Sequence, residues 1–170
     1  FNQFERVKYF QDLRFVSFVE FEKDLKVDGV VFKPISVGDN LAQTLSLAKI
    51  KQAHIAETEK YAFVTYYFNG LREVNYPNQS NFMIASPKVT TYDLKPQMSS
   101  PQITAQILSL LDTKSYPFIL ANFANPDMVG HTGVLKAGIA AIESIDNALS
   151  KIIPVILAKD AVCVVTADHG

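Results

Sequence analysis

Short, continuous apolar runs alternate with longer amphipathic segments along this chain. Two of the runs are residues 118–124 (FILANFA) and residues 161–166 (AVCVVT). Runs of this length that are rich in Val, Ile and Phe favour strands buried on both faces of a parallel sheet. Between the two runs, apolar residues recur at helical spacing: Ala141, Ile142, Ile145, Leu149 and Ile152. The order strand, helix, strand predicts an α/β fold.

Similar patterns predict the remaining elements. Strands are expected at residues 14–21, 30–32, 61–68 and 82–85, with a turn at Gly29 between the first two. A helix capped by Asp39 or Asn40 presents Leu41, Leu45 and Ala48. A second helix, capped by Ser99 or Ser100, presents Ile103, Ile107, Leu110 and Leu111 to the core. Pro154 should end or kink the helix that follows residue 141.

An Asp and a His follow each of the two apolar runs. Residues 125–133 (NPDMVGHTG) contain Asp127 and His131, and residues 166–170 (TADHG) contain Asp168 and His169. In open α/β sheets, ligand-binding groups gather beyond the carboxyl ends of the strands. Asp oxygens and His nitrogens are ligands of Mn, Zn and similar ions. The pattern predicts a metal site, and its alternatives are a loop turn with a hydrogen-bonded His and a helix cap after the second run.

Four segments carry a family resemblance. Residues 56–62 (AETEKYA), 86–96 (SPKVTTYDLKP), 124–133 (ANPDMVGHTG) and 166–170 (TADHG) resemble motifs of the cofactor-independent phosphoglycerate mutases, in the same order and spacing. This family belongs to the alkaline-phosphatase-like superfamily. The resemblance implies a mostly parallel sheet flanked by helices in a partial metal-binding domain, residues 34–170. It also implies that residues 1–33 are the tail of a second α/β domain, the phosphotransferase domain that holds the substrate.

The resemblance further implies an isomerase of glycolysis and gluconeogenesis. Members interconvert 3-phosphoglycerate and 2-phosphoglycerate through a phosphoserine, without added 2,3-bisphosphoglycerate. They use two divalent ions, for which manganese is expected here, with magnesium, cobalt or zinc as alternatives. Asp127 and His131 would bind one ion, and Asp168 and His169 the other. Lys60 would stabilise the phosphoserine, with Glu57 and Glu59 as supporting acidic neighbours.

The chain departs from the family pattern in two ways. The family often has His where this chain has Phe63, and Gly where it has Leu71. The nucleophilic Ser, an arginine cluster and further metal ligands are not found in these residues, so we expect the chain to be an internal, C-terminal-half piece of a larger protein and inactive by itself. Two alternatives stay open. One is another phosphomutase or phosphatase of the superfamily, such as a phosphopentomutase, and the other is a non-catalytic metal-binding domain.

Composition narrows the classes of partner. The chain has 170 residues, is 48% hydrophobic and carries a net charge of −1. This charge lacks the basic excess that is typical of nucleic-acid-binding domains. No apolar run reaches the roughly 18 residues that span a membrane. The single cysteine excludes an internal disulfide and suits a reducing, cytoplasmic setting. We expect a monomeric parent that acts on a small phosphoglycerate substrate. His54 lies outside the motifs, and a surface or helix-face position is expected for it.

Overall fold

The computed structural model describes residues 5, 7, 8, 10–20, 24–35, 37–167 and 169. The chain divides into two compact units, residues 1–36 and residues 37–170. The division falls inside the segment from Pro34 to Gly38. The two units are described separately, and the assignment of the first to a phosphotransferase domain stays a prediction.

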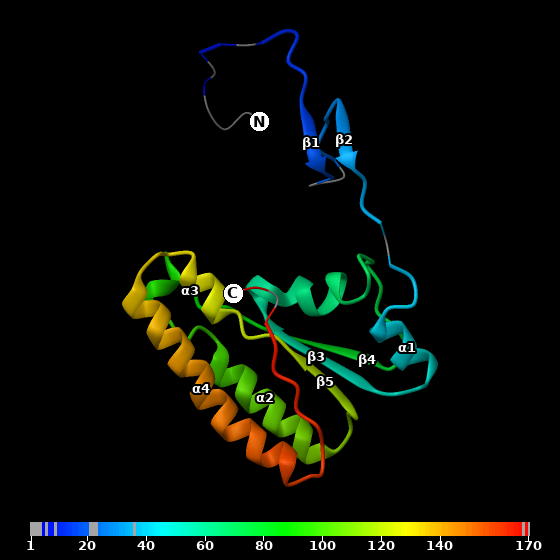
Figure 1. The fold of residues 1–170 in the computed structure, drawn as a ribbon, viewed down its shortest axis with the longest axis vertical. Coiled ribbons are helices and arrows are strands. Elements are labelled where there is room, and N and C mark those ends of the chain that lie inside the picture. The colour runs from blue at the N-terminus through cyan, green and yellow to red at the C-terminus, as the bar shows by residue number, and fades with distance from the viewer. Residues whose placement is uncertain are drawn as a thin grey trace. The chain divides into compact units, whose positions relative to one another are not determined.

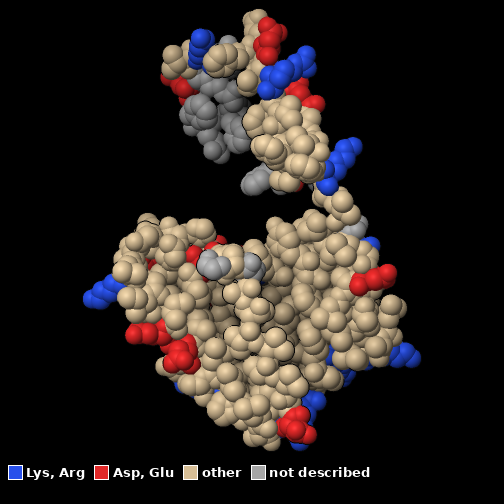
Figure 2. All heavy atoms as spheres, viewed as in Figure 1, with Lys and Arg blue, Asp and Glu red and all other residues tan. Residues whose placement is uncertain are grey.

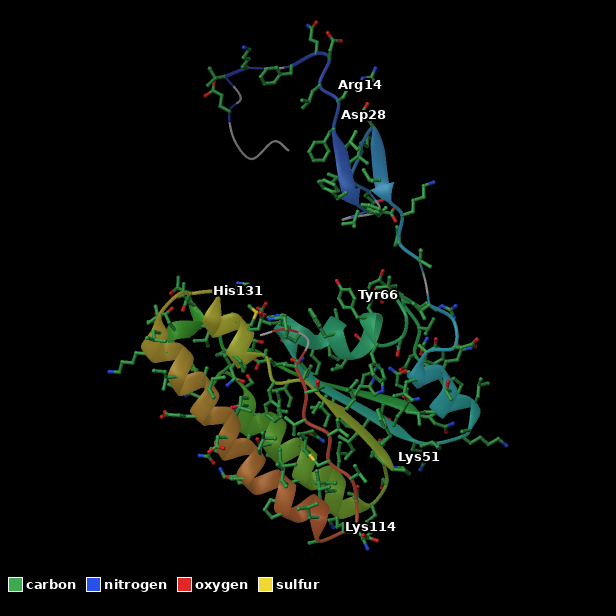
Figure 3. The ribbon with its side chains drawn as sticks, in the orientation of Figure 1. Arg14, Asp28, Lys51, Tyr66, Lys114 and His131 are labelled. Atoms are coloured by element: carbon green, nitrogen blue, oxygen red, sulfur yellow. The ribbon has the colours of Figure 1, made fainter. Side chains whose placement is uncertain are left out.

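The first unit contains a pair of parallel strands. Strand β1 (Val16–Val19) lies beside β2 (Gly29–Phe32). The carboxylate of Asp28 accepts a hydrogen bond from the backbone N–H of Phe15 at 2.8 Å and forms an ion pair with Arg14 at 3.1 Å. Figure 3 labels Arg14 and Asp28 beside these strands. Asp28 thus joins the start of one strand to the start of the other.

The predicted strands of this unit are confirmed in part. The turn expected at Gly29 is wrong, because Gly29 is the first residue of β2 and lies opposite Val16. The connection between two parallel strands cannot be a tight turn at the strand itself. The end of the first predicted strand, Phe21, lies outside the described residues.

The second unit is built on a three-stranded parallel sheet (Figure 1). Strand β3 (Gln52–Glu57) lies in the middle, between β4 (Gln79–Ile84) and β5 (Phe118–Ala121). All six residues of β3 are buried. The carboxyl ends of the three strands therefore lie at one edge of the sheet, as expected for parallel strands.

Helices surround this sheet. They are α1 (Leu41–Leu47), the 3₁₀ turn η1 (Thr58–Lys60), the π-helix η2 (Phe63–Tyr67), the 3₁₀ turn η3 (Tyr92–Leu94), α2 (Ser100–Thr113), α3 (Asn125–Gly130) and α4 (Leu135–Leu157). The predicted starts of two helices are confirmed. The side chain of Asn40 caps α1 by accepting a hydrogen bond from the backbone N–H of Gln43, and Ser99 precedes α2. Pro154 lies inside α4 and does not end it.

The two faces of β3 bury different side chains, because alternate residues of a strand point to opposite faces. Ala53 and Ile55 belong to an apolar cluster with residues of α2 and α4, namely Ile103, Ile107, Leu110 and Ile152. Figure 1 shows α2 and α4 running side by side. Gln52 and His54 lie on the other face. Gln52 donates a hydrogen bond from Nε2 to the carbonyl of Ala42 in α1, and His54 contacts η2.

Two sequence predictions near the middle of the chain are wrong. Residues 61–68 do not form a strand but contain η2, and His54 is fully buried in a strand instead of lying at the surface. A crossover between the parallel strands β3 and β4 favours helical turns in this connection. Aromatic residues have high β propensity, but here the ring of Phe68 packs edge-on against His54 at 5.2 Å. Tertiary packing thus overrides local preference.

The strand predicted at residues 161–166 is also wrong. The structure has no strand there, and Val162 and Val164 are exposed. This segment borders a cavity of about 1530 Å³ lined by residues of β5, α2 and α4. A strand needs a hydrogen-bonded neighbour, and the ladder of β5 is formed with β3 alone among the described residues. Figure 2 shows this face of the unit as mostly uncharged, with Lys, Arg, Asp and Glu near its outline.

The sequence places both Ile142 and Ile152 in one apolar pattern at helical spacing, but the structure gives them different burial. Ile152 is 4% exposed and Ile142 is 57% exposed. We expect Ile152→Ala to lower the free energy of unfolding by about 2–5 kcal/mol, because it leaves a cavity among packed side chains. The matched variant Ile142→Ala should change it by no more than about 0.5 kcal/mol. Urea denaturation of both variants measures this, and equal losses would contradict the packing described here.

Candidate metal and phosphoryl-binding site

Three of the four motif segments begin where a strand of the central sheet ends. Residues 58–60 follow β3, residues 86–93 follow β4, and residues 125–131 follow β5. Because the three strands are parallel, these segments meet at one edge of the sheet. The fourth segment reaches the same place through His169.

Asp127 is the point where three of these segments meet, those that contain Lys60, His131 and His169. Its Oδ2 is buried and lies 2.6 Å from Nζ of Lys60, which forms an ion pair with it. Its Oδ1 lies 3.3 Å from Nε2 of His131 and 3.4 Å from Nε2 of His169. One carboxylate thus contacts a cation from the segment after β3, an imidazole from its own segment and an imidazole from the fourth segment.

Local structure explains the positions of Asp127 and His131. Pro126 lies at the start of α3, where its missing N–H costs no hydrogen bond. Asp127 lies in the first turn, where the helix dipole favours a negative charge. The residue four positions later lies on the same side of the helix, which brings His131 to Asp127 as the sequence predicts. Figure 3 labels His131 at the end of α3.

The electrostatics of the site keep Asp127 ionised. The contact with the Lys60 ammonium is the main cause that lowers the pKa of the Asp127 carboxyl, and the two histidines add to it. Burial acts in the opposite direction and does not prevail. Asp127 therefore carries its charge at neutral pH and is available to a cation.

Glu57 and Glu59, which the sequence assigns to Lys60 as supporting neighbours, contact other groups. Glu57 is fully buried and accepts hydrogen bonds from the Ser86 hydroxyl at 2.9 Å and the Ser99 backbone N–H at 3.4 Å. Glu59 accepts a hydrogen bond from the Tyr92 hydroxyl at 2.7 Å. The two carboxylates thus join the first motif segment to the second. The acidic partner of Lys60 is Asp127 instead.

Tyr92 contributes to this connection. Burial and the hydrogen bond to the Glu59 carboxylate raise the pKa of its hydroxyl to about 12. The hydroxyl is therefore protonated at neutral pH and remains a hydrogen-bond donor. The sequence gives Tyr92 no chemical role, and its spacing from Glu59 along the chain holds no signal for this contact.

Phe63, which the sequence marks only as a departure from the family pattern, is a second residue of the site. Nζ of Lys60 lies 4.4 Å from the centroid of its ring. Lys60 and Phe63 are three residues apart, a spacing that brings side chains together only in a helical segment. The three-residue spacing would indicate this contact only if residues 61–68 were expected to be helical, and the sequence predicts a strand there.

The donors at Asp127 suit part of a metal site. In a tetrahedral site, two ligand atoms that each lie about 2.1 Å from one ion are about 3.4 Å apart. Each His nitrogen lies at such a distance from Asp127 Oδ1. Within the described ranges no group of three or more His, Cys, Asp or Glu side chains is arranged so that it could hold a metal ion. The predicted ligand Asp168 lies outside those ranges.

Comparison with known protein families agrees with this chemistry. A family profile described as the metalloenzyme superfamily matches residues 30–170. The chain belongs to the metalloenzyme superfamily. This membership accounts for the α/β fold with parallel strands and flanking helices.

Two relatives with similar sequences have the same name. The 2,3-bisphosphoglycerate-independent phosphoglycerate mutase of Acetivibrio thermocellus is 45% identical over 170 residues, which is all of this chain and 33% of that protein. The enzyme of the same name from Chloroflexus aurantiacus is 47% identical over 166 residues, 98% of this chain and 31% of that protein. The chain thus spans about a third of the length of these relatives.

A solved structure also resembles this metalloenzyme-superfamily chain. It is the crystal structure of Leishmania mexicana phosphoglycerate mutase at low cobalt concentration. The TM-score is 0.81 and the sequences are 31% identical, over 100% of this chain and 31% of that one. The fold of the chain is therefore that of part of a phosphoglycerate mutase.

Glu57 gives a prediction for the pH dependence of stability. Burial raises the pKa of its carboxyl above the usual 4.5. Its folded form therefore binds the proton more tightly than the unfolded chain does. The stability that Glu57 contributes is complete below pH about 4.5 and is lost as the pH rises through the folded pKa.

We therefore expect Glu57→Gln to gain stability relative to the wild type as the pH rises from about 4 to 7. Denaturant unfolding at a series of pH values measures the difference between the two proteins. The control Glu143→Gln changes an exposed residue of α4 and should leave that difference independent of pH. A flat profile for Glu57→Gln would contradict the effect of burial.

Proposed function

We propose that the chain is the metal-binding part of a phosphoglycerate mutase that interconverts 3-phosphoglycerate and 2-phosphoglycerate through a phosphoserine. The observation that carries the proposal is the meeting of Lys60, His131 and His169 at the Asp127 carboxylate. The names of the relatives support the same reaction. The nucleophilic Ser and the substrate-binding arginines would come from other parts of a larger protein, so the isolated chain should not turn over substrate.

Each residue of the site has a use in this reaction. Transfer of a phosphoryl group between oxygens depends mainly on positioning and on neutralisation of negative charge. Asp127 and neutral His131 and His169 would bind divalent cations, together with Asp168. Two such ions, when bound, would lower the pKa of a Ser hydroxyl and neutralise phosphoryl oxygens. Lys60 would add a positive charge at the edge of the same site, where it could contact the phosphoryl group.

The finer assignments follow from this proposal. Manganese is the ion we expect, since Asp and His together suit it. The described part of the chain contains no helix long and apolar enough to cross a membrane. We place the whole protein in the cytoplasm as a monomer, with phosphoglycerate as its substrate and no need for added 2,3-bisphosphoglycerate.

The experiment that tests the proposal is an assay of the whole protein that contains this chain. Interconversion of 3-phosphoglycerate and 2-phosphoglycerate is the expected result. Turnover of pentose phosphates, or simple phosphate release, would assign it instead to another phosphomutase or to a phosphatase. Metal binding without turnover of any of these would indicate a non-catalytic domain.

Metal binding should depend on Asp127. We expect Asp127→Asn to weaken manganese binding by at least about 10-fold, because it removes the negative charge of the carboxylate that lies between His131 and His169. Asp112→Asn is a matched control, since Asp112 is an exposed residue of α2. Titration calorimetry and metal analysis of the purified proteins measure both. Unchanged manganese affinity in Asp127→Asn would remove Asp127 from the site.

Lys60 should act on the phosphoryl group. Lys60→Ala in the whole protein should lower kcat by about 10²-fold, the usual effect of losing one charge-stabilising donor. Metal content should be retained, because removal of a positive charge does not weaken the binding of a cation nearby. Lys51→Ala is the control, because Lys51 (labelled in Figure 3) is exposed and directly precedes β3, whereas Lys60 follows the end of that strand. Near-normal kcat, or loss of metal, in Lys60→Ala would refute this role.

A further inference from the structure

We propose that Phe63 is a positioning residue that holds the ammonium group of Lys60 in place for the phosphoryl group. This inference rests on the proposed function, since it concerns the same site. It adds a residue whose ring has no chemistry of its own and whose effect reaches the reaction through Lys60.

The contacts of Lys60 carry the proposal. Its Nζ lies 4.4 Å from the centroid of the Phe63 ring and 2.6 Å from Oδ2 of Asp127. The side chain of Lys60 is 15% exposed, so little water competes with these two contacts. The face of an aromatic ring is electronegative and attracts a cation at this distance. The ring and the carboxylate together restrict an otherwise flexible side chain to one orientation.

The backbone that carries Phe63 is fixed from the interior of the sheet. Phe63 begins η2, a π-helix, which is a rare structure that is often found at functional sites. The carbonyl of Val64, the next residue, lies 2.6 Å from Nδ1 of His54. A carbonyl only accepts, so this nitrogen carries the proton and donates the hydrogen bond. His54 is fully buried in the central strand β3.

One neighbouring aromatic residue contacts the ring itself. The ring of Phe63 packs against that of Tyr67, with 5.1 Å between centroids. Lys60 and Phe63 also belong to consecutive helical turns. The ammonium group and the ring that contacts it therefore move together. The position of the ammonium is thereby tied to β3 through Phe63, Val64 and His54, independently of Asp127.

Two substitutions separate the electronic effect of the ring from its volume. Phe63→Leu keeps an apolar side chain but removes the aromatic face, and Phe63→Tyr keeps that face. Tyr66→Leu is the matched control, because Tyr66 (labelled in Figure 3) lies in the same π-helix, whereas the ring over the Lys60 ammonium is that of Phe63. All three variants would be made both in this chain and in the whole protein.

The first measurement is the proton chemical shift of the Lys60 ε-methylene by NMR. The wild type, Phe63→Tyr and Tyr66→Leu should show the upfield shift caused by a ring over the side chain. Phe63→Leu should lose it. This readout needs no catalytic activity and reports the contact by itself.

The second measurement is turnover of 3-phosphoglycerate by the whole protein. Phe63→Leu should lower kcat by about 3- to 10-fold, the range expected for loss of a partly desolvated cation–ring contact. KM and metal content should change less than about 2-fold, since substrate and metals bind through other groups. Phe63→Tyr and Tyr66→Leu should keep the wild-type kcat.

The outcomes distinguish this inference from the proposed function. If the wild type turns over phosphoglycerate and Phe63→Leu keeps its kcat, Phe63 has no positioning role, while the proposed function stands. If kcat falls as much in Phe63→Tyr as in Phe63→Leu, the aromatic face is not what holds Lys60, and the inference is wrong. If the wild type has no turnover, the proposed function fails and this inference fails with it, even where NMR finds the contact.

Discussion

The structure of the second unit depends on the burial of one strand on both of its faces. Every residue of β3 is buried, and the strand is paired in parallel with a neighbour on each side. Parallel pairing brings the carboxyl ends of three strands to one edge. The segments that leave this edge therefore start from rigid positions. Lys60 and Asp127 are distant in the sequence, but they meet because each lies a few residues beyond the end of a neighbouring strand.

The charge at that edge is balanced around a single carboxylate. A buried carboxylate is costly unless a cation or hydrogen-bond donors compensate it. At Asp127 the compensation comes from the ammonium of Lys60 and from two imidazoles, each on a different segment. The same requirement explains why this place suits divalent cations and phosphoryl groups, since both need fixed, opposite charges.

Polar groups of β3 and of the turn that follows it connect the site to the sheet. Glu57 holds Ser86 and the start of α2, and Glu59 holds Tyr92, so the loop after β4 is tied to the end of β3. On the opposite face from the apolar cluster, His54 holds the π-helix through Val64. Hydrogen bonds of this kind are costly to leave unmade and so favour one arrangement of the segments. The site is thus supported by the least exposed part of the unit.

The sequence by itself determined the class of fold, the helices α1, α2 and α4, and the spacing that places His131 beside Asp127. These are local properties, set by hydrophobic periodicity, capping residues and the pitch of a helix. It did not determine β3, because His54 and Gln52 interrupt the apolar pattern of that strand. Nor did it determine the helical form of residues 61–68, whose aromatic side chains favour a strand when read alone.

Only the tertiary structure decided which charged groups meet. Lys60 pairs with Asp127 and not with the adjacent glutamates, and those glutamates bind Ser86, Ser99 and Tyr92. These partners lie many residues apart in the chain, so no local spacing encodes them. The apolar residues 161–166 show the same limit of local patterns. Their hydrophobicity favours burial, but a strand forms only where a neighbouring strand offers unpaired backbone groups. Periodicity determines single elements, and the pairing of strands determines the site.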